Sequence, residues 1–89
     1  MISGPITIIN RLGLHARAAT RLVKCASVFE SEVHVVKGQR RINGKSIMGV
    51  LTLAASKGTE LVIEAEGRDE QAAFDAICEL INDCFGEGE

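Results

Sequence analysis

Residues 60–70 read ELVIEAEGRDE, and every second residue of the run 60–66 is apolar (Leu61, Ile63 and Ala65), while three of the other four are glutamates. Alternation with a period of two is typical of a β-strand with one face buried and the other in water. Gly67 closes the run, and Asp69 follows as a favoured N-cap residue with Glu70 in the first turn of a helix. This stretch therefore predicts a strand followed closely by a helix.

Apolar side chains at helical spacing predict where two helices face the core. After Asp69 they form one stripe, made of Ala73, Ile77, Leu80, Ile81 and Cys84. Near the other end of the chain, the segment from Ala16 to about Ser27 has apolar side chains at i, i+3, i+4 and i+7, namely Ala19, Leu22, Val23 and Ala26. Both segments are predicted to be helices that lie on a sheet.

The remaining elements complete an alternating order. Short β-branched or alternating runs predict strands over residues 5–10, 32–37 and 40–42. Ser46, a favoured N-cap, predicts a short helix that ends before Lys57-Gly58. The order β-α-β-β-α-β-α predicts an α+β open-faced sandwich, with four mostly antiparallel strands and three helices on one face. We expect a single domain over residues 1–89, with residues 1–4 and 86–89 frayed.

Composition excludes several classes of function. A net charge of −2 and a pI near 5.7 argue against a protein that neutralises a nucleic-acid backbone. RNA-binding sheets need exposed strand aromatics, and the three aromatic residues all lie outside the predicted strands. No apolar run approaches the roughly 20 residues of a membrane span, and no signal peptide is evident, so we expect a cytoplasmic protein. The three cysteines form no C-x-x-C pair, and neither a metal nor a cofactor is predicted.

His15 stands immediately before the first predicted helix, where N–H groups lack intrahelical partners. We expect the N–H groups of Ala16, Arg17 and Ala18 to form an anion site with the helix dipole. A cation is disfavoured there, so the imidazole is expected to stay neutral at pH 7 and to keep a nucleophilic lone pair. The guanidinium of Arg17 is suited to phosphate oxygens. The pattern favours a phosphorylated histidine.

Other roles for His15 are less well supported by the surrounding sequence. A catalytic general base usually has a carboxylate that orients it, and residues 1–29 contain no Asp or Glu. An exposed histidine near a helix start is also common without any function, and spacing alone leaves that alternative open.

Two motifs resemble a known family. Residues 13–17, Gly-Leu-His-Ala-Arg, together with Ala19, resemble the active-site motif of the HPr family, the histidine phosphocarriers of the bacterial phosphoenolpyruvate:sugar phosphotransferase system. Residues 43–50, Asn-Gly-Lys-Ser-Ile-Met-Gly-Val, resemble the segment that carries the regulatory serine of the family. The resemblance extends over residues 5–85 without a gap and includes the runs at 57–59 and 64–70.

The resemblance implies specific roles and partners. Enzyme I would phosphorylate His15 at Nδ1, Arg17 would pair with the phosphoryl group, and an enzyme IIA-type protein would receive it. Ser46 would be the site of an ATP-dependent HPr kinase/phosphorylase. The protein would then be a relay component rather than an enzyme. The family usually has proline where this chain has Ala18, so we expect altered transfer kinetics rather than lost function.

A docking surface is predicted beside His15. The short helix after Ser46 is apolar on almost every side and cannot bury all of its side chains, so Ile47 and Met48 are expected to stay exposed. Basic residues would form a rim that attracts acidic partners. The predicted docking residues are Thr20, Arg21, Lys24, Lys45, Ile47, Met48 and Leu51.

Two further questions stay open at the level of sequence. A purely regulatory HPr, or a nitrogen-related paralogue whose phosphorylation state controls other proteins, would carry similar residues. The sequence fixes neither the sugar nor the enzyme IIA partner, and a monomer is the default expectation.

Overall fold

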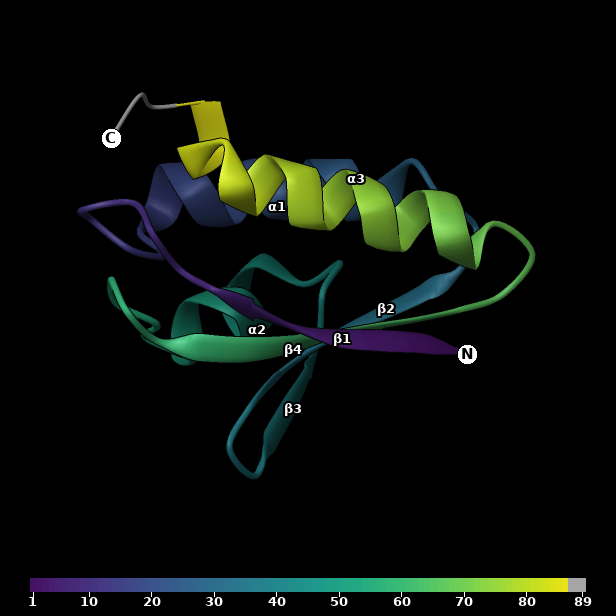
Figure 1. Ribbon diagram of the computed structural model, residues 1–89, viewed down its shortest axis with the longest axis horizontal. Helices are drawn as coiled ribbons and strands as arrows, with labels where there is room; N and C mark the ends of the chain where they lie inside the picture. The colour runs from purple at the N-terminus through teal and green to yellow at the C-terminus, as the bar shows by residue number, and fades with distance from the viewer. Residues whose placement is uncertain (87–89) are drawn as a thin grey trace.

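The computed structural model describes residues 1–86 as a sheet with helices packed on it (Figure 1). The strands are β1 (Ile2–Thr7), β2 (Glu32–Lys37), β3 (Arg40–Asn43) and β4 (Glu60–Glu66). The helices are α1 (Ala16–Ser27), α2 (Ile47–Thr52), α3 (Glu70–Asn82) and the 3₁₀ turn η1 (Cys84–Gly86). The sheet order is β1-β4-β2-β3, and neighbouring strands are antiparallel.

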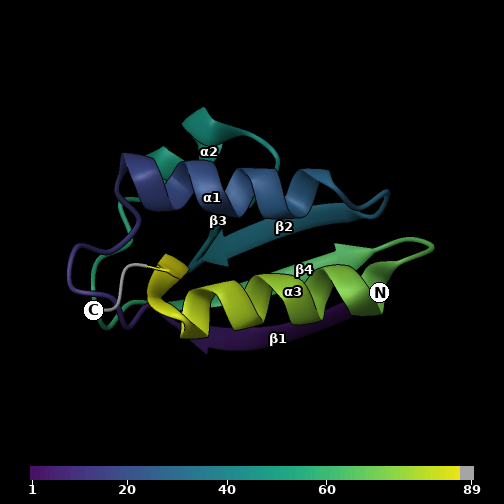
Figure 2. The ribbon, with the colours of Figure 1, turned by 90° about the horizontal axis from the view of Figure 1, so that it is seen from above.

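The helices lie on one face of the sheet, as the sequence predicts. α1 and α3 run side by side in opposite directions, and α2 lies beyond α1, near β3 (Figure 2). The predicted element order and α+β architecture are therefore confirmed. None of the helices within residues 1–86 is long and apolar enough to cross a bilayer.

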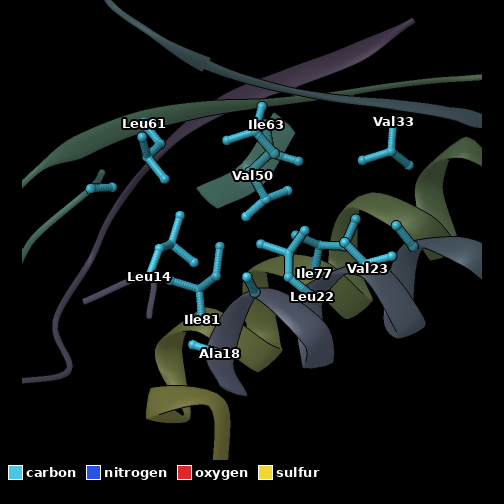
Figure 3. Packing of buried hydrophobic residues seen from close by; sticks show 14 of the residues in the cluster. Leu14, Ala18, Leu22, Val23, Val33, Val50, Leu61, Ile63, Ile77 and Ile81 are labelled. Atoms are coloured by element: carbon cyan, nitrogen blue, oxygen red, sulfur yellow. The ribbon is translucent and has the colours of Figure 1, made fainter. Parts of the chain in front are cut away.

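The core forms where the helix stripes meet the buried face of the sheet (Figure 3). The predicted stripe of α1 is buried as a whole, and Leu22 in its middle has no exposed surface. From α3, Ala73, Ile77 and Ile81 are buried, whereas Leu80 is only partly so. The alternation in β4 has the predicted outcome, because Leu61, Ile63 and Ala65 are buried and the side chains between them are not.

The first strand begins three residues earlier than predicted. The sequence places it over residues 5–10 with residues 1–4 frayed, but Ile2 pairs with Ala65, and the ladder runs to Thr7. Gly4 fits because a Cβ there would lie 3.0 Å from the Phe74 ring. Pro5 is tolerated because β1 is an edge strand. Tertiary packing thus extends the predicted strand back over Gly4.

A short 3₁₀ turn follows α3 at the end of the described part of the chain. After α3 the chain turns back through Cys84 and Phe85, which adopt left-handed φ values of 54° and 55°. This turn buries the Phe85 side chain completely. Gly86 belongs to the same turn, and the remaining residues for which fraying was predicted, 87–89, lie outside the described part of the chain.

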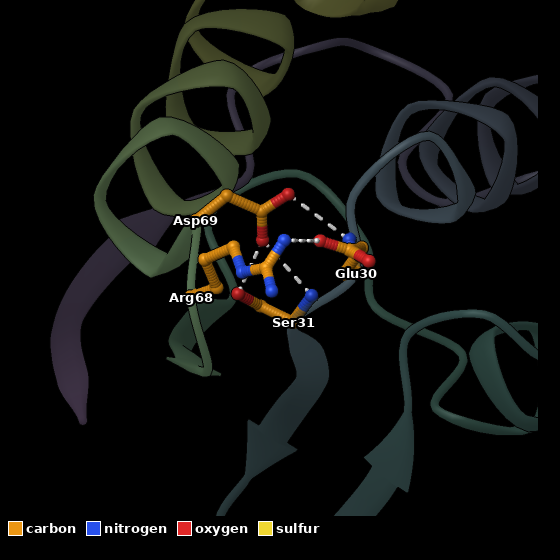
Figure 4. A network of polar contacts seen from close by, with 4 residues as sticks. All are labelled: Glu30, Ser31, Arg68 and Asp69. Carbon is orange, nitrogen blue, oxygen red and sulfur yellow. Dashed lines mark hydrogen bonds and ion pairs between the residues drawn. The ribbon is translucent and has the colours of Figure 1, made fainter.

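A polar latch joins two loops at the C-terminal end of α1 (Figure 4). Asp69 Oδ2 accepts from the Glu30 N–H at 3.0 Å, while its Oδ1 accepts from the N–H and the hydroxyl of Ser31 at 2.9 and 2.5 Å. The hydroxyl of Ser31 and the backbone N–H of Glu30 lower the pKa of Asp69 to about 2. The latch fixes the entry to β2 against the start of α3.

Candidate functional site

A tight loop carries His15 to the start of α1. The Gly13 N–H donates to the Asn10 carbonyl at 3.2 Å, and the Asn10 side-chain amide donates to the Gly13 carbonyl at 2.9 Å. The same Gly13 carbonyl accepts the His15 N–H at 2.9 Å. Leu14, which is buried, donates its N–H to the Ala55 carbonyl at 2.8 Å. Backbone bonds on both sides of His15 therefore fix its position.

Gly13 is required at the closest approach of this loop to the segment after α2. Its φ is +67°, and a Cβ built on it would lie 2.5 Å from the Ala55 carbonyl oxygen and 2.8 Å from the Ser56 Cα. Both obstacles are backbone atoms, which cannot turn aside as a flexible side chain could. Any larger residue at this position has to displace the loop.

His15 is the N-cap residue of α1, as predicted. Its backbone is extended, with φ −79° and ψ 179°, and its carbonyl accepts the Ala19 N–H at 2.8 Å. This is the usual arrangement of an N-cap, whose carbonyl accepts the first helical hydrogen bond. The residue as a whole is half-buried, and its Nε2 atom is buried. The solvent-accessible surface of His15 therefore lies away from Nε2.

The first turn of α1 is exposed to solvent beside His15. Ala16 and Arg17 are exposed, and no acidic residue lies in the turn. Ala18, the next residue of the turn, has no exposed surface. The place of Ala18 in a backbone anion site stays a prediction.

Ser46 caps α2, as predicted. Its hydroxyl accepts the Gly49 N–H at 3.1 Å, and its carbonyl accepts the Val50 N–H at 3.0 Å. The side chain is half-buried.

These features coincide with the pattern of a known family. A family model described as "PTS HPr component phosphorylation site" matches residues 2–83. The chain belongs to the HPr family. It is 54% identical over 89 residues, the whole of both chains, to the phosphocarrier protein HPr of Neisseria meningitidis serogroup A. It is 43% identical to the phosphocarrier protein NPr of Shewanella violacea over 92% of this chain and 90% of that one.

Solved HPr structures share the fold. A crystal structure of an HPr from Thermoanaerobacter tengcongensis matches with a TM-score of 0.94 and 44% identity over 98% of both chains. A crystal structure of the HPr dimer from the same organism matches with a TM-score of 0.79 and 44% identity, over 98% of this chain and 100% of that one. The chain is thus a phosphocarrier of the phosphotransferase system, and its monomeric state stays a prediction.

Helix α2 presents an apolar surface. Ile47 is 43% exposed and Met48 is 72% exposed, whereas Val50 and Leu53 are buried. The expectation that part of the helix stays uncovered is therefore confirmed. Leu51 differs from Ile47 and Met48, because it is half-buried and packs against the core.

The residues of the predicted basic rim differ in their contacts. Lys24 is exposed in the last turn of α1. Arg21 instead donates to the Phe85 carbonyl, and the Lys45 ammonium donates to the Phe29 carbonyl at 2.8 Å. Thr20 is half-buried and donates its hydroxyl to the Ala16 carbonyl at 2.8 Å. Arg21 and Lys45 therefore also hold segments of the fold together.

Sequence reasoning missed the residues that support His15 from outside the motif. Asn10 and Ala55 contact the loop through hydrogen bonds, and Phe85 anchors the C-terminal turn against α1 through Arg21. Asn10 carried one available signal, because a polar residue directly after a β-branched run can turn the chain by bonding its own backbone. For Ala55 and Phe85 the contacts depend on tertiary structure.

Proposed function

We propose that this HPr chain accepts a phosphoryl group on Nδ1 of His15 from phospho-enzyme I, which phosphoenolpyruvate charges. It then passes the group to an enzyme IIA-type protein in the cytoplasm. The observation that carries the proposal is the position of His15 as N-cap beside the exposed first turn of α1.

The burial of one ring nitrogen of His15 indicates which nitrogen accepts the phosphoryl group. Nε2 of His15 is buried, and a phosphorus atom attacked in line needs open space beyond the attacking nitrogen. Nδ1 therefore supplies the lone pair. A P–N bond forms at Nδ1 while the bond between phosphorus and the donor atom of enzyme I breaks, and the bonding electrons leave with that donor atom. The transfer to enzyme IIA reverses the roles.

Neighbouring groups stabilise the bound phosphoryl group. The N–H groups of Ala16 and Arg17 lie at the positive end of α1, and the Arg17 guanidinium adds a full positive charge on an exposed side chain. Exposure keeps this attraction moderate, because water screens exposed charges. Moderate binding suits a carrier, since a phosphoryl group held strongly would not be passed on. The partners then supply most of the transition-state stabilisation.

Partners dock on the surface around His15. Ile47 and Met48 provide exposed apolar contacts, and Lys24 attracts acidic groups. Thr20, Arg21, Lys45 and Leu51 contribute through their remaining exposed surface. A monomer suffices for this relay, because all of these residues come from one chain.

Ser46 provides regulation through an ATP-dependent HPr kinase/phosphorylase. A phosphate on this hydroxyl brings a charge of about −1.5 to −2 to the edge of the apolar surface. Because Ile47 and Met48 follow directly, this charge repels acidic partners and raises the desolvation cost of docking. The effect is electrostatic and needs no change of fold.

The test is a reconstituted relay. Purified chain is incubated with enzyme I and labelled phosphoenolpyruvate, and then with candidate enzyme IIA proteins of the sugar and nitrogen types. We expect label on the wild-type chain, none on His15→Ala, and onward transfer to a sugar-type enzyme IIA. Transfer only to a nitrogen-type acceptor identifies the chain as the regulatory paralogue, and absence of label on the wild type contradicts the proposal.

A further inference from the structure

The loop before His15 reverses the usual distribution of polar and apolar side chains. Asn10 has no exposed surface, whereas Ile9 and Leu12, its apolar neighbours in the loop, are 44% and 65% exposed. Burying an amide is unfavourable unless it makes hydrogen bonds, and exposing two large aliphatic side chains contributes nothing to the core. Burial of Ile9 and Leu12 therefore does not hold this loop, whereas buried Leu14 and the hydrogen bonds of Asn10 do.

The hydrogen bonds of Asn10 lead directly to His15. Its Nδ2–H donates to the Gly13 carbonyl at 2.9 Å, and that same carbonyl accepts the His15 N–H at 2.9 Å. The Asn10 carbonyl accepts the Gly13 N–H at 3.2 Å. One buried side chain thus holds the peptide group that orients the backbone of His15.

From this geometry we propose that Asn10 is a positioning residue for phosphoryl transfer at His15. It acts by fixing the 10–14 loop, so that the imidazole stands at the exposed first turn of α1 before a partner arrives. The inference rests on the proposed function. Pre-organisation matters because in-line transfer depends chiefly on placement, and a displacement of about 1 Å can cost roughly 100-fold in rate.

Two variants separate the role of the donor from the role of side-chain volume. Asn10→Asp keeps the size and shape of the side chain but replaces the Nδ2–H donor with an oxygen, which repels the Gly13 carbonyl. Asn10→Ala removes both donor and volume, yet leaves the Gly13 carbonyl bonded to the His15 N–H. Asn10→Ala is therefore expected to fold even if Asn10→Asp does not.

A matched control lies at the opposite end of α1. Asp69→Asn weakens the latch to Glu30 and Ser31 and so lowers stability without touching the His15 loop. Transfer from enzyme I is measured for all variants at temperatures where each is fully folded. The two Asn10 variants are expected to lose at least 10-fold in kcat with a smaller change in KM, because docking residues are unaltered. Asp69→Asn should stay within 2-fold of the wild type.

A second readout does not depend on phosphate at all. In Asn10→Ala, the His15 and Leu14 N–H groups should exchange with solvent at least 10-fold faster than expected from the change in global stability, and the His15 ring signals should shift. In Asp69→Asn, neither the excess exchange at these two N–H groups nor the shift of the His15 ring signals is expected. If the wild type takes no phosphate, the proposed function fails, and the exchange data alone decide whether Asn10 positions His15.

Three results would overturn the role of Asn10. One is transfer within 2-fold of the wild type by folded Asn10→Ala. Another is an equal loss of kcat in Asp69→Asn at matched stability. The third is exchange at His15 and Leu14 that only follows global unfolding in every variant.

Discussion

The Leu14 N–H donates a 2.8 Å hydrogen bond to the Ala55 carbonyl, which joins the loop before His15 to the turn after α2. Leu14 immediately precedes His15, the proposed phosphoacceptor, whereas Ala55 lies beyond the helix that Ser46 caps. This hydrogen bond therefore joins the segment that carries His15, the proposed site of transfer, to the segment that follows the helix capped by Ser46, the proposed site of regulation.

Gly13→Ala tests whether the loop before His15 must lie as close as it does to the backbone of Ala55. The new Cβ would lie 2.5 Å from the Ala55 carbonyl oxygen, at a φ of +67° that alanine disfavours. We expect the free energy of unfolding to fall by about 2 kcal/mol or more and transfer to slow at least 10-fold. Chemical denaturation and the relay assay measure the two effects. Normal transfer by a folded variant would show that the close approach is dispensable.

Ala54→Gly is expected to stabilise the protein. Ala54 is exposed and adopts φ +50°, a left-handed conformation that costs a non-glycine residue about 1–2 kcal/mol. Glycine relieves this cost but loses about 0.5–1 kcal/mol through the greater freedom of the unfolded chain. The expected net gain is therefore about 0.5–1 kcal/mol in urea denaturation. A loss of stability would mean that the alanine methyl group makes a packing contribution larger than the strain.

Ser46→Asp tests the electrostatic account of regulation. Aspartate can still accept the Gly49 N–H as an N-cap, so stability is expected to change by less than about 1 kcal/mol. The added charge beside Ile47 and Met48 should nevertheless slow phosphate uptake from enzyme I at least 10-fold.

Ser3→Asp is the matched control for Ser46→Asp. It adds the same charge at an exposed position on edge strand β1, and uptake should be unchanged. Equal uptake by Ser46→Asp and the wild type would refute the electrostatic account.

Acid stability tests the latch at Asp69. Its pKa is about 2 in the folded protein and 3.8 in an unperturbed carboxyl, chiefly because of the Ser31 hydroxyl and the Glu30 N–H. A lowered folded-state pKa contributes stability that is fully present above pH 4 and is lost as the pH falls toward 2. Asp69→Asn should be less stable than the wild type at pH 7, and the difference should shrink between pH 4 and pH 2. If the difference in stability between Asp69→Asn and the wild type did not change between pH 4 and pH 2, the ionised Asp69 carboxylate would not be what stabilises the latch.

Sequence periodicity predicted the elements whose burial is decided locally. The alternation around Ile63 and the stripe around Leu22 each fix a face, and the sheet buries both as expected. Gly4 was misjudged because its place in β1 depends on packing against the Phe74 ring, which the local sequence does not specify, whereas Pro5 lies in the first strand as predicted.

The candidate site also contains some features that the local sequence predicts and others that depend on tertiary contacts. Helix-start chemistry predicted the N-cap positions of His15 and Ser46, because an N-cap is defined by its immediate neighbours. The hydrogen bonds of Arg21 to Phe85 and of Leu14 to Ala55 join residues that are far apart in the sequence, and no local sequence pattern predicts them. The burial of Ala18 likewise follows from packing and not from its place in the first turn.

The central claim is most directly tested by locating the phosphate on the intact chain. The protein, labelled with ¹⁵N in its histidines, is incubated with enzyme I and phosphoenolpyruvate, and the ring nitrogens of His15 are observed by NMR. The account predicts one acid-labile phosphoryl group per chain, bonded to Nδ1 of His15, with His34 unchanged. A phosphoryl group on Nε2, on another residue, or equally on a His15→Ala variant would contradict it.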